Sequence, residues 1–244
     1  MSGFSLAWQQ FRLERKLFWR NPSAAFFNFL LPLLLLVLVA SVFAGDPGEL
    51  DVLVPGVAGM SVMATTFSAL AFNLTFLREQ GILKRVRGTP LPEASYLSGL
   101  LGSAVVNAFA QVALVILIGH YGYGVELPQD PLLLAGFTAL GVVAFGALGI
   151  AFSHAIPNFD SAPAYVNAVF LPLILISGVF YSSDDLPALL DGAAQALPLT
   201  HLIDGLSAAI VGGSLAGSEL TAALVVAGWA LAGAVLAVRG FRWE

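Results

Sequence analysis

The residues best suited to act on a partner lie in one polar stretch, Arg78–Tyr96 (REQGILKRVRGTPLPEASY). We predict that it forms a short basic helix, which Gly88 and Pro90 end, followed by a segment that prolines stiffen. A role as a cytoplasmic loop that fixes the orientation of the spans would explain the cations. It would not explain the Gly-Thr-Pro-Leu-Pro sequence that follows them. The cations are Arg78, Lys84, Arg85 and Arg87.

The sequence lacks the residues that nucleotide binding, thiol chemistry and proteolysis require. A phosphate-binding loop needs Lys before Ser or Thr, but Leu17 follows Lys16 and Arg85 follows Lys84. Cysteine is absent, which excludes thiol catalysis and thiolate metal sites. The three histidines fall near predicted span ends or in loops, and no G-x-S-x-G turn is present, which argues against an intramembrane protease. We therefore expect a non-enzymatic chain that binds no metal or cofactor.

The composition sets the class of protein. The 244 residues are 58% hydrophobic and 10% charged, with a mean hydropathy of +0.88. Soluble domains carry about 25% charged residues, so a soluble enzyme, a disordered chain and a nucleic-acid binder are excluded. Long unbroken apolar runs, rather than short alternating ones, predict an all-α integral membrane protein.

Six apolar runs each reach the length that crosses a bilayer. An alternative has four spans, with a re-entrant hairpin at His154–Pro163. Residues 182–218 are interrupted by prolines and a Gly-Gly pair, which favours two short helices dipping into the outer leaflet over an ordinary surface loop. We divide the chain into an interfacial segment, 1–22, and a six-span domain, 23–244, with spans at 24–44, 53–77, 96–120, 132–152, 162–181 and 220–238.

The basic residues predict the orientation. All ten precede the first span, separate spans two and three, or follow span six, whereas the loops on the other side carry only acids. The positive-inside rule then places both termini in the cytoplasm.

The stretch Ser5–Arg20 predicts an amphipathic helix on the membrane surface. Its aromatic face contains Phe4, Trp8, Phe11 and Phe18, and a separate basic face contains Arg12, Lys16 and Arg20. The helix is either a topology anchor alone or also a docking element for a cytosolic partner. The residues assigned to either role are Trp8, Phe11, Arg12, Arg15 and Lys16.

Spans two and five carry amides and hydroxyls beside aromatic rings, a mixture that suits an amphipathic cargo. Hydrogen bonding between helices is the competing interpretation. The spans contain essentially no charge, which argues against proton coupling, while sodium coupling or a channel stays open. The residues of this candidate path are Thr66, Phe72, Asn73, Asn167 and Phe170.

Three blocks carry a family resemblance. The first follows the pattern RExGTLExLxxTPLxxxxY, with Ile82 where Thr is common and Lys84 where Glu is common. The others are Arg20–Gly45 and a block after span five that includes Gly178, Phe180, Leu186, Pro187, Pro198, Leu199 and Thr200. Together they resemble the type-2 ABC exporter permeases, the family of the daunorubicin-exporter and nodulation-signal-exporter permeases. The first block matches at Arg78, Glu79, Gly81, Leu83, Thr89, Pro90, Leu91 and Tyr96.

The resemblance implies a homodimeric permease in a bacterial or archaeal cytoplasmic membrane, with membrane lipids around it and one cytosolic ATPase subunit on each copy. ATP and Mg would bind in that ATPase. The loop 78–95 would be the coupling loop, helped by the N-terminal helix and by residues 154–161, while spans two and five would meet their symmetry mates. The implied coupling residues are Arg78, Glu79, Gly81, Lys84, Arg85, Arg87, Gly88, Thr89, Pro90, Leu91 and Pro92.

The short helices after span five would close the extracellular side, through Phe180, Tyr181, Pro187, Pro198 and Thr200. The implied activity is ATP-driven export of a hydrophobic or amphipathic compound, either drug-like or a lipid. Export of a lipid-linked glycan is the alternative within the family, and an ion-coupled secondary transporter or channel is the alternative outside it.

Overall fold

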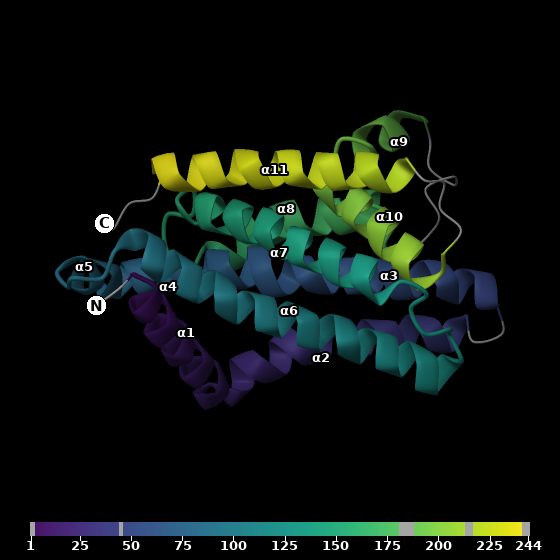
Figure 1. The fold of residues 1–244 in the computed structure, drawn as a ribbon, viewed down its shortest axis with the longest axis horizontal. Helices are drawn as coiled ribbons and strands as arrows, with labels where there is room; N and C mark the ends of the chain where they lie inside the picture. Colours follow the sequence, from purple (N-terminus) through teal and green to yellow (C-terminus); the bar gives the residue numbers. More distant parts are fainter. Residues whose placement is uncertain (1–2, 44–45, 181–187, 213–216, 241–244) are drawn as a thin grey trace.

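A computed structural model describes residues 3–43, 46–180, 188–212 and 217–240 (Figure 1). Every regular element in these ranges is helical. The elements are α1 (Gly3–Arg20), α2 (Pro22–Val42), α3 (Pro47–Met63), the π-helical turn η1 (Ala64–Ser68), α4 (Ala69–Glu79), α5 (Ile82–Arg87), α6 (Glu93–Tyr123), α7 (Pro131–Ser153), α8 (Ala162–Ile176), α9 (Ala188–Ala194), α10 (Pro198–Ile210) and α11 (Ser218–Gly240).

Four helices of the described chain are long and apolar enough to cross a membrane: Gly48–Glu79, Glu93–Tyr123, Pro131–Ser153 and Ser218–Gly240. Two shorter apolar helices, Phe29–Val42 and Ala162–Ile176, fall within the predicted first and fifth spans. The prediction of a helical protein with helices of membrane-crossing length is confirmed, and the number six stays a prediction.

Helix α8 ends five residues before the predicted end of span five. Pro172 lies inside it, and Gly178 then takes a left-handed backbone conformation with φ 73°. A left-handed residue cannot continue a right-handed helix. The chain therefore turns after Ile176, and Val179 packs into the core beside α3.

Two matching caps fix where α3 and α7 begin. The carboxylate of Asp46 accepts a hydrogen bond from the Gly48 backbone N–H at 3.0 Å, and Pro47 is the first helical residue. Asp130 does the same for Leu132 N–H, at 3.0 Å, and Pro131 follows it. Aspartate before proline satisfies the first free N–H groups of a helix with a preset backbone angle. Both caps lie at the right-hand end in Figure 1.

The core forms where α10 inserts between α3, α7 and α11. Leu199, Leu202 and Leu206 on α10 are completely buried. Two short helices, α9 and α10, lie in the segment 182–218, where two short helices are expected. The burial of α10 does not fit an ordinary surface loop. How deep they lie in a membrane stays a prediction.

The π turn η1 interrupts the longest helix in its middle. Because α7 has no side chain at Gly149, its backbone approaches η1 so closely that a methyl group there would lie 2.6 Å from the Phe67 carbonyl oxygen. The ring of Phe67 packs on that of Phe152, with centroids 5.3 Å apart. The extra residue of the π turn is therefore held by direct contact with α7.

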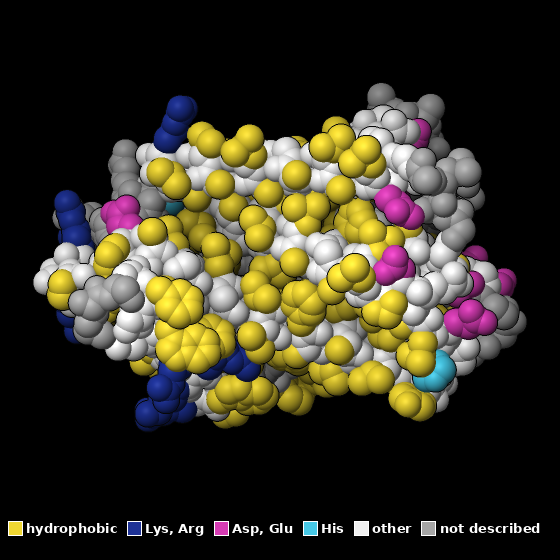
Figure 2. Space-filling model, in the orientation of Figure 1, with side chains coloured by type: hydrophobic (Ala, Val, Ile, Leu, Met, Phe, Trp, Pro, Cys, Tyr) yellow, Lys and Arg dark blue, Asp and Glu magenta, His cyan; other side chains and the backbone are white. Residues whose placement is uncertain are grey.

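Charged side chains separate to the two ends of the molecule. In Figure 2 hydrophobic side chains cover the middle, Lys and Arg gather at the left end and most Asp and Glu at the right. The left end holds α5, the start of α1 and the end of α11 (Figure 1). An apolar belt between a basic and an acidic end is the distribution predicted from the sequence.

Candidate functional site

Helix α5 presents its cations outward and its apolar residues inward. Gly81, with φ 64°, supplies the left-handed turn that separates it from α4. Leu83 is only 2% exposed and packs into a second core cluster with Leu74 and Tyr96, while Val86 packs against the same cluster. The buried leucine fixes which face of this one-and-a-half-turn helix points outward. The exposed cations on that face are Lys84, Arg85 and Arg87.

The non-helical part of the predicted coupling loop is shorter than 78–95, because α4 continues through Glu79 and α6 begins at Glu93. Thr89 ends α5 by donating from Oγ1 to the Val86 carbonyl at 2.6 Å. Gly88 and Pro90 are exposed between the helices, Leu91 packs against the second core cluster, and Pro92 is extended with ψ 145°. The extended proline lets α6 begin directly after it.

Arg78 and Glu79 point to a different loop. The Arg78 guanidinium donates to the carbonyl of Ser153, at 2.9 Å, and to that of Ile156. The Glu79 carboxylate accepts from the backbone N–H of Phe159 at 2.6 Å. Both contacts are to residues at the end of α7 or in the turn 154–161 that follows, so these two residues are not on the exposed face of α5.

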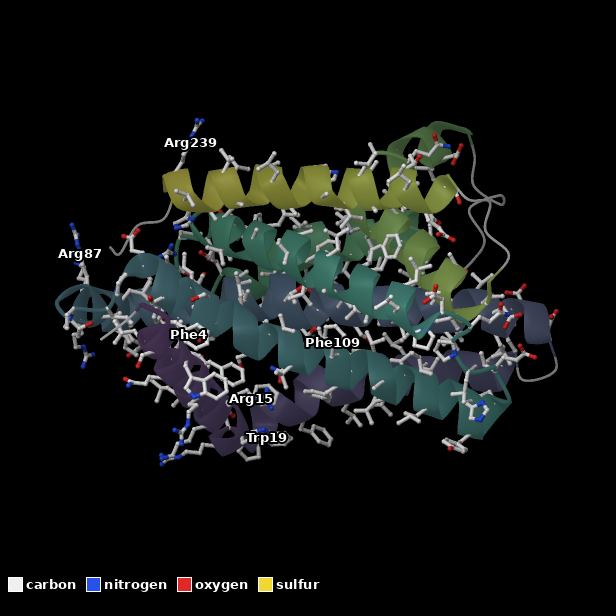
Figure 3. The ribbon with its side chains drawn as sticks, in the orientation of Figure 1. Phe4, Arg15, Trp19, Arg87, Phe109 and Arg239 are labelled. Atoms are coloured by element: carbon white, nitrogen blue, oxygen red, sulfur yellow. The ribbon has the colours of Figure 1, made fainter. Side chains whose placement is uncertain are left out.

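Helix α1 lies against α6 at the basic end (Figure 3). Gln10 is buried between them, and Ser95 donates from Oγ to the Gly3 carbonyl at 3.0 Å. Phe4 and Trp8 are 82% and 54% exposed, and Trp8 stacks on Phe11 with centroids 5.1 Å apart. Exposed aromatic rings beside a helix that spans the apolar belt suit the predicted interfacial position.

Arg15 behaves differently from its basic neighbours. Arg12 and Lys16 are exposed, but Arg15 lies over the rings of Phe18 and Trp19, 5.6 and 5.8 Å from their centroids, and donates to Asn107 Oδ1 on α6. Arg15 therefore belongs to the aromatic side of α1 and ties it to α6.

On the neighbouring face, burial raises the pKa of Glu14, although a hydrogen bond from Gln10 partly opposes the shift.

The path through the five candidate residues stays a prediction, and the structure gives the surroundings of each one. The Thr66 hydroxyl donates to the Val62 carbonyl of its own helix at 2.6 Å, which is neither a cargo contact nor a bond between helices. Phe72, Asn73 and Phe170 are half-buried, and Asn167 is exposed.

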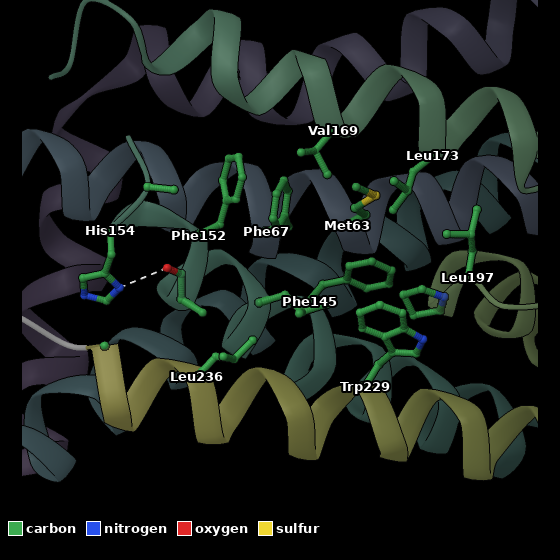
Figure 4. A pocket seen from close by; sticks show the side chains of 15 residues that line it. Met63, Phe67, Phe145, Phe152, His154, Val169, Leu173, Leu197, Trp229 and Leu236 are labelled. Atoms are coloured by element: carbon green, nitrogen blue, oxygen red, sulfur yellow. Dashed lines mark hydrogen bonds between the residues drawn. The ribbon is translucent and has the colours of Figure 1, made fainter. Parts of the chain in front are cut away.

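A hollow lies between α8 and α11, with α7 and η1 beneath it (Figure 4). Its volume is about 430 Å³. The rings of Phe67, Phe145, Phe152 and Trp229 line it, together with aliphatic side chains and His154 at one end. Such a volume with an aromatic lining suits a small apolar molecule. None of the five path residues lines this groove.

Of the predicted closure residues, Pro198 and Thr200 are buried at the start of α10, and Phe180 is half-buried against the core. Tyr181 and Pro187 lie outside the described residues.

The sequence matches the family model described as ABC-2 type transporter over residues 4–211. The chain belongs to the ABC-2 type transporter family. This membership and the four described helices of membrane-crossing length support a membrane protein of the permease type.

The ABC-2 permease is similar to several curated proteins. It is 26% identical over 156 residues to the putative transport permease YvfS of Bacillus subtilis, and 22% identical over 166 residues to the probable multidrug ABC transporter permease YbhS of Escherichia coli. It is 28% identical over 168 residues to nodulation protein J of Rhizobium leguminosarum. These matches cover 63%, 67% and 64% of this chain, and 63%, 44% and 64% of the relatives, less than two thirds of each relative.

Sequence reasoning missed several residues of the ABC-2 permease that the structure brings forward. The apolar Leu83 and Val86, three residues apart among cations, were a readable signal for an anchored helix. No pattern along the chain indicates that Phe145 and Trp229 line the same groove, because their helices are far apart in sequence. Ser153, Ile156 and Phe159 contact Arg78 and Glu79 mainly through backbone groups, which carry no sequence signature.

Proposed function

We propose that the chain is the permease of an ATP-driven exporter that moves a hydrophobic or amphipathic compound out of the cytoplasm or the inner leaflet. Two copies span a bacterial or archaeal cytoplasmic membrane six times each, and each copy contacts one cytosolic ATPase subunit, where ATP and Mg bind. Family membership and the apolar belt between charged ends support this assembly.

The basic end is the cytoplasmic end in this proposal, because cytoplasmic loops carry the excess of Lys and Arg. Both ends of the chain then lie in the cytoplasm, and α9 and α10 lie toward the extracellular side. α1 rests on the inner leaflet with its aromatic rings among lipids.

The observation that carries the proposal is α5. A short helix whose apolar side is buried and whose exposed side holds Lys84, Arg85 and Arg87 is suited to move with a docked acidic partner. Rigid attachment is needed because a coupling element transmits free energy only if it moves as a body. The second contact is the turn 154–161.

The test is a charge reversal on α5. We expect Arg85→Glu combined with Arg87→Glu to abolish ATP-dependent export and ATPase co-purification, since the docking surface changes sign, while membrane insertion stays normal. Arg239→Glu, at the same end but on α11, is the matched control and should retain export. Undiminished export in the double variant would contradict the coupling role of α5.

The aromatic groove supports an apolar cargo rather than a glycan, since sugar hydroxyls would meet few polar groups in its lining. In proteoliposomes that contain the ATPase, Trp229→Ala and Phe145→Ala should weaken stimulation of ATP hydrolysis by apolar aromatic compounds. Leu231→Ala, on the exposed side of α11 with 68% exposure, should not. Equal stimulation in all three variants would remove the groove from the cargo route.

A further inference from the structure

The structure assigns Arg78 and Glu79 a positioning role: they fasten the α5 region to the turn 154–161, so that both cytoplasmic loops of one permease move as a single body. We call these two residues and their contacts with Ser153, Ile156 and Phe159 the loop clamp. The clamp goes beyond the proposed docking role, because it joins the two loops without the ATPase.

The arginine half of the clamp holds the end of α7. Ser153 is the last residue of that helix, and Ile156 lies in the turn just after it. The last carbonyls of a helix lack intrahelical donors and carry the negative end of the helix dipole. One planar guanidinium bonded to the Ser153 carbonyl at the helix end and to the Ile156 carbonyl in the turn fixes the helix end relative to the turn.

The glutamate half has the opposite polarity. Its carboxylate accepts from the Phe159 N–H, and the ring of Phe159 packs edge-on against Phe76 of α4 with centroids 5.3 Å apart. Two adjacent residues thus bind carbonyls at one side of the turn and an N–H at the other. This pairing of donor and acceptor contacts fixes the orientation of the turn as well as its distance from α4.

The clamp has a mechanical consequence. α5 is joined to α4 through Gly81, and α8 begins at Ala162, three residues after Phe159. A displacement of the α4 end is therefore delivered to α8 through the clamp, without passing through the apolar groove. Arg78 and Glu79 act through the turn and need no direct contact with the ATPase.

The absence of cysteine allows a direct test on the whole permease. Lys84→Cys and Asp160→Cys place spin labels on exposed positions of α5 and the turn, and pulsed electron resonance then measures the distance between them in lipid nanodiscs. We expect one narrow distribution that broadens about twofold when Arg78→Ala and Glu79→Ala are added, because free loops sample more positions. An unchanged width in that variant would overturn the clamp.

Single substitutions keep the test valid if the double variant does not fold. Glu79→Gln keeps an acceptor oxygen for the Phe159 N–H and should retain the narrow distribution, whereas Glu79→Ala should broaden it. Equal widths for these two variants would also overturn the clamp.

A second measurement rests on the proposed function and uses the permease with its ATPase. When the clamp is intact, the labelled distance should stay the same with and without trapped ATP. Cargo stimulation of ATP hydrolysis should be lost in Glu79→Ala. A distance that changes with nucleotide would refute the single body. If the permease that keeps Lys84 binds no ATPase, the proposed function fails, and the nanodisc measurement on the labelled permease alone still decides the clamp.

Discussion

The contact between Gly149 and the π turn yields a prediction with a built-in control on the same helix. In Gly149→Ala the new methyl group would lie 2.6 Å from the Phe67 carbonyl oxygen and 2.9 Å from its Cα. These neighbours are backbone atoms, so α7 or the whole π turn must move by several tenths of an ångström. Overpacking of this kind costs about 1–3 kcal/mol, and the better helix propensity of alanine recovers about 0.5–1 kcal/mol of it.

We therefore expect a net loss of about 1–2 kcal/mol, which lowers the unfolding midpoint by about 2–8 °C for a chain of this size. The assay is thermal unfolding in lipid nanodiscs followed by intrinsic fluorescence of the four tryptophans. The control is Gly136→Ala, also on α7, where the methyl group would meet no atom within 4 Å and the midpoint should stay equal or rise. Equal midpoints for the two variants would refute the close contact.

Three further predictions concern other contacts. Leu83→Ala should loosen α5, because the helix loses its buried anchor, and should raise the rate of tryptic cleavage within α5 about tenfold or more. An unchanged rate of cleavage would contradict the anchoring. Burial raises the pKa of Glu14, which penalises its charged form as the pH rises through the folded-state pKa. Glu14→Gln should therefore raise the unfolding midpoint at pH 7. The difference in midpoint between this variant and the unsubstituted chain should shrink at pH values below the ordinary pKa of a carboxyl group. A difference that does not depend on pH would exclude this explanation. Asp130→Ala should cost about 0.5–2 kcal/mol of unfolding free energy by removing the α7 cap, whereas Asp130→Asn should keep most of it, as thermal unfolding would measure.

The sequence predicted the features that depend on neighbouring residues. The helical class follows from the long apolar runs, and the boundaries of α7, Pro131–Ser153, differ by one residue at each end from the predicted span. The basic helix at Ile82–Arg87 was readable because its cations and its glycine breaks are contiguous in the chain.

The features that depend on contacts between distant segments were not predictable. Its place in the basic stretch groups Arg78 with the cations that follow it, and no local pattern shows that its side chain reaches backbone carbonyls 75 and 78 residues away. The sequence does not show that the Thr66 hydroxyl bonds within its own helix, as the hydroxyl of its neighbour Thr65 also does. Composition along a helix does not show which way a single hydroxyl turns.

The π turn also restricts how the longest helix can vary in length. Each residue of an α-helix turns the chain by about 100°, so deleting one residue from α4 before Arg78 would rotate the end of that helix by about that angle. Arg78 and Glu79 would then face away from the turn that they hold. The π turn holds one residue more than an α-helical turn, so a single deletion within Ala64–Ser68 can be absorbed by a return to α-helical spacing, whereas a deletion in α4 cannot.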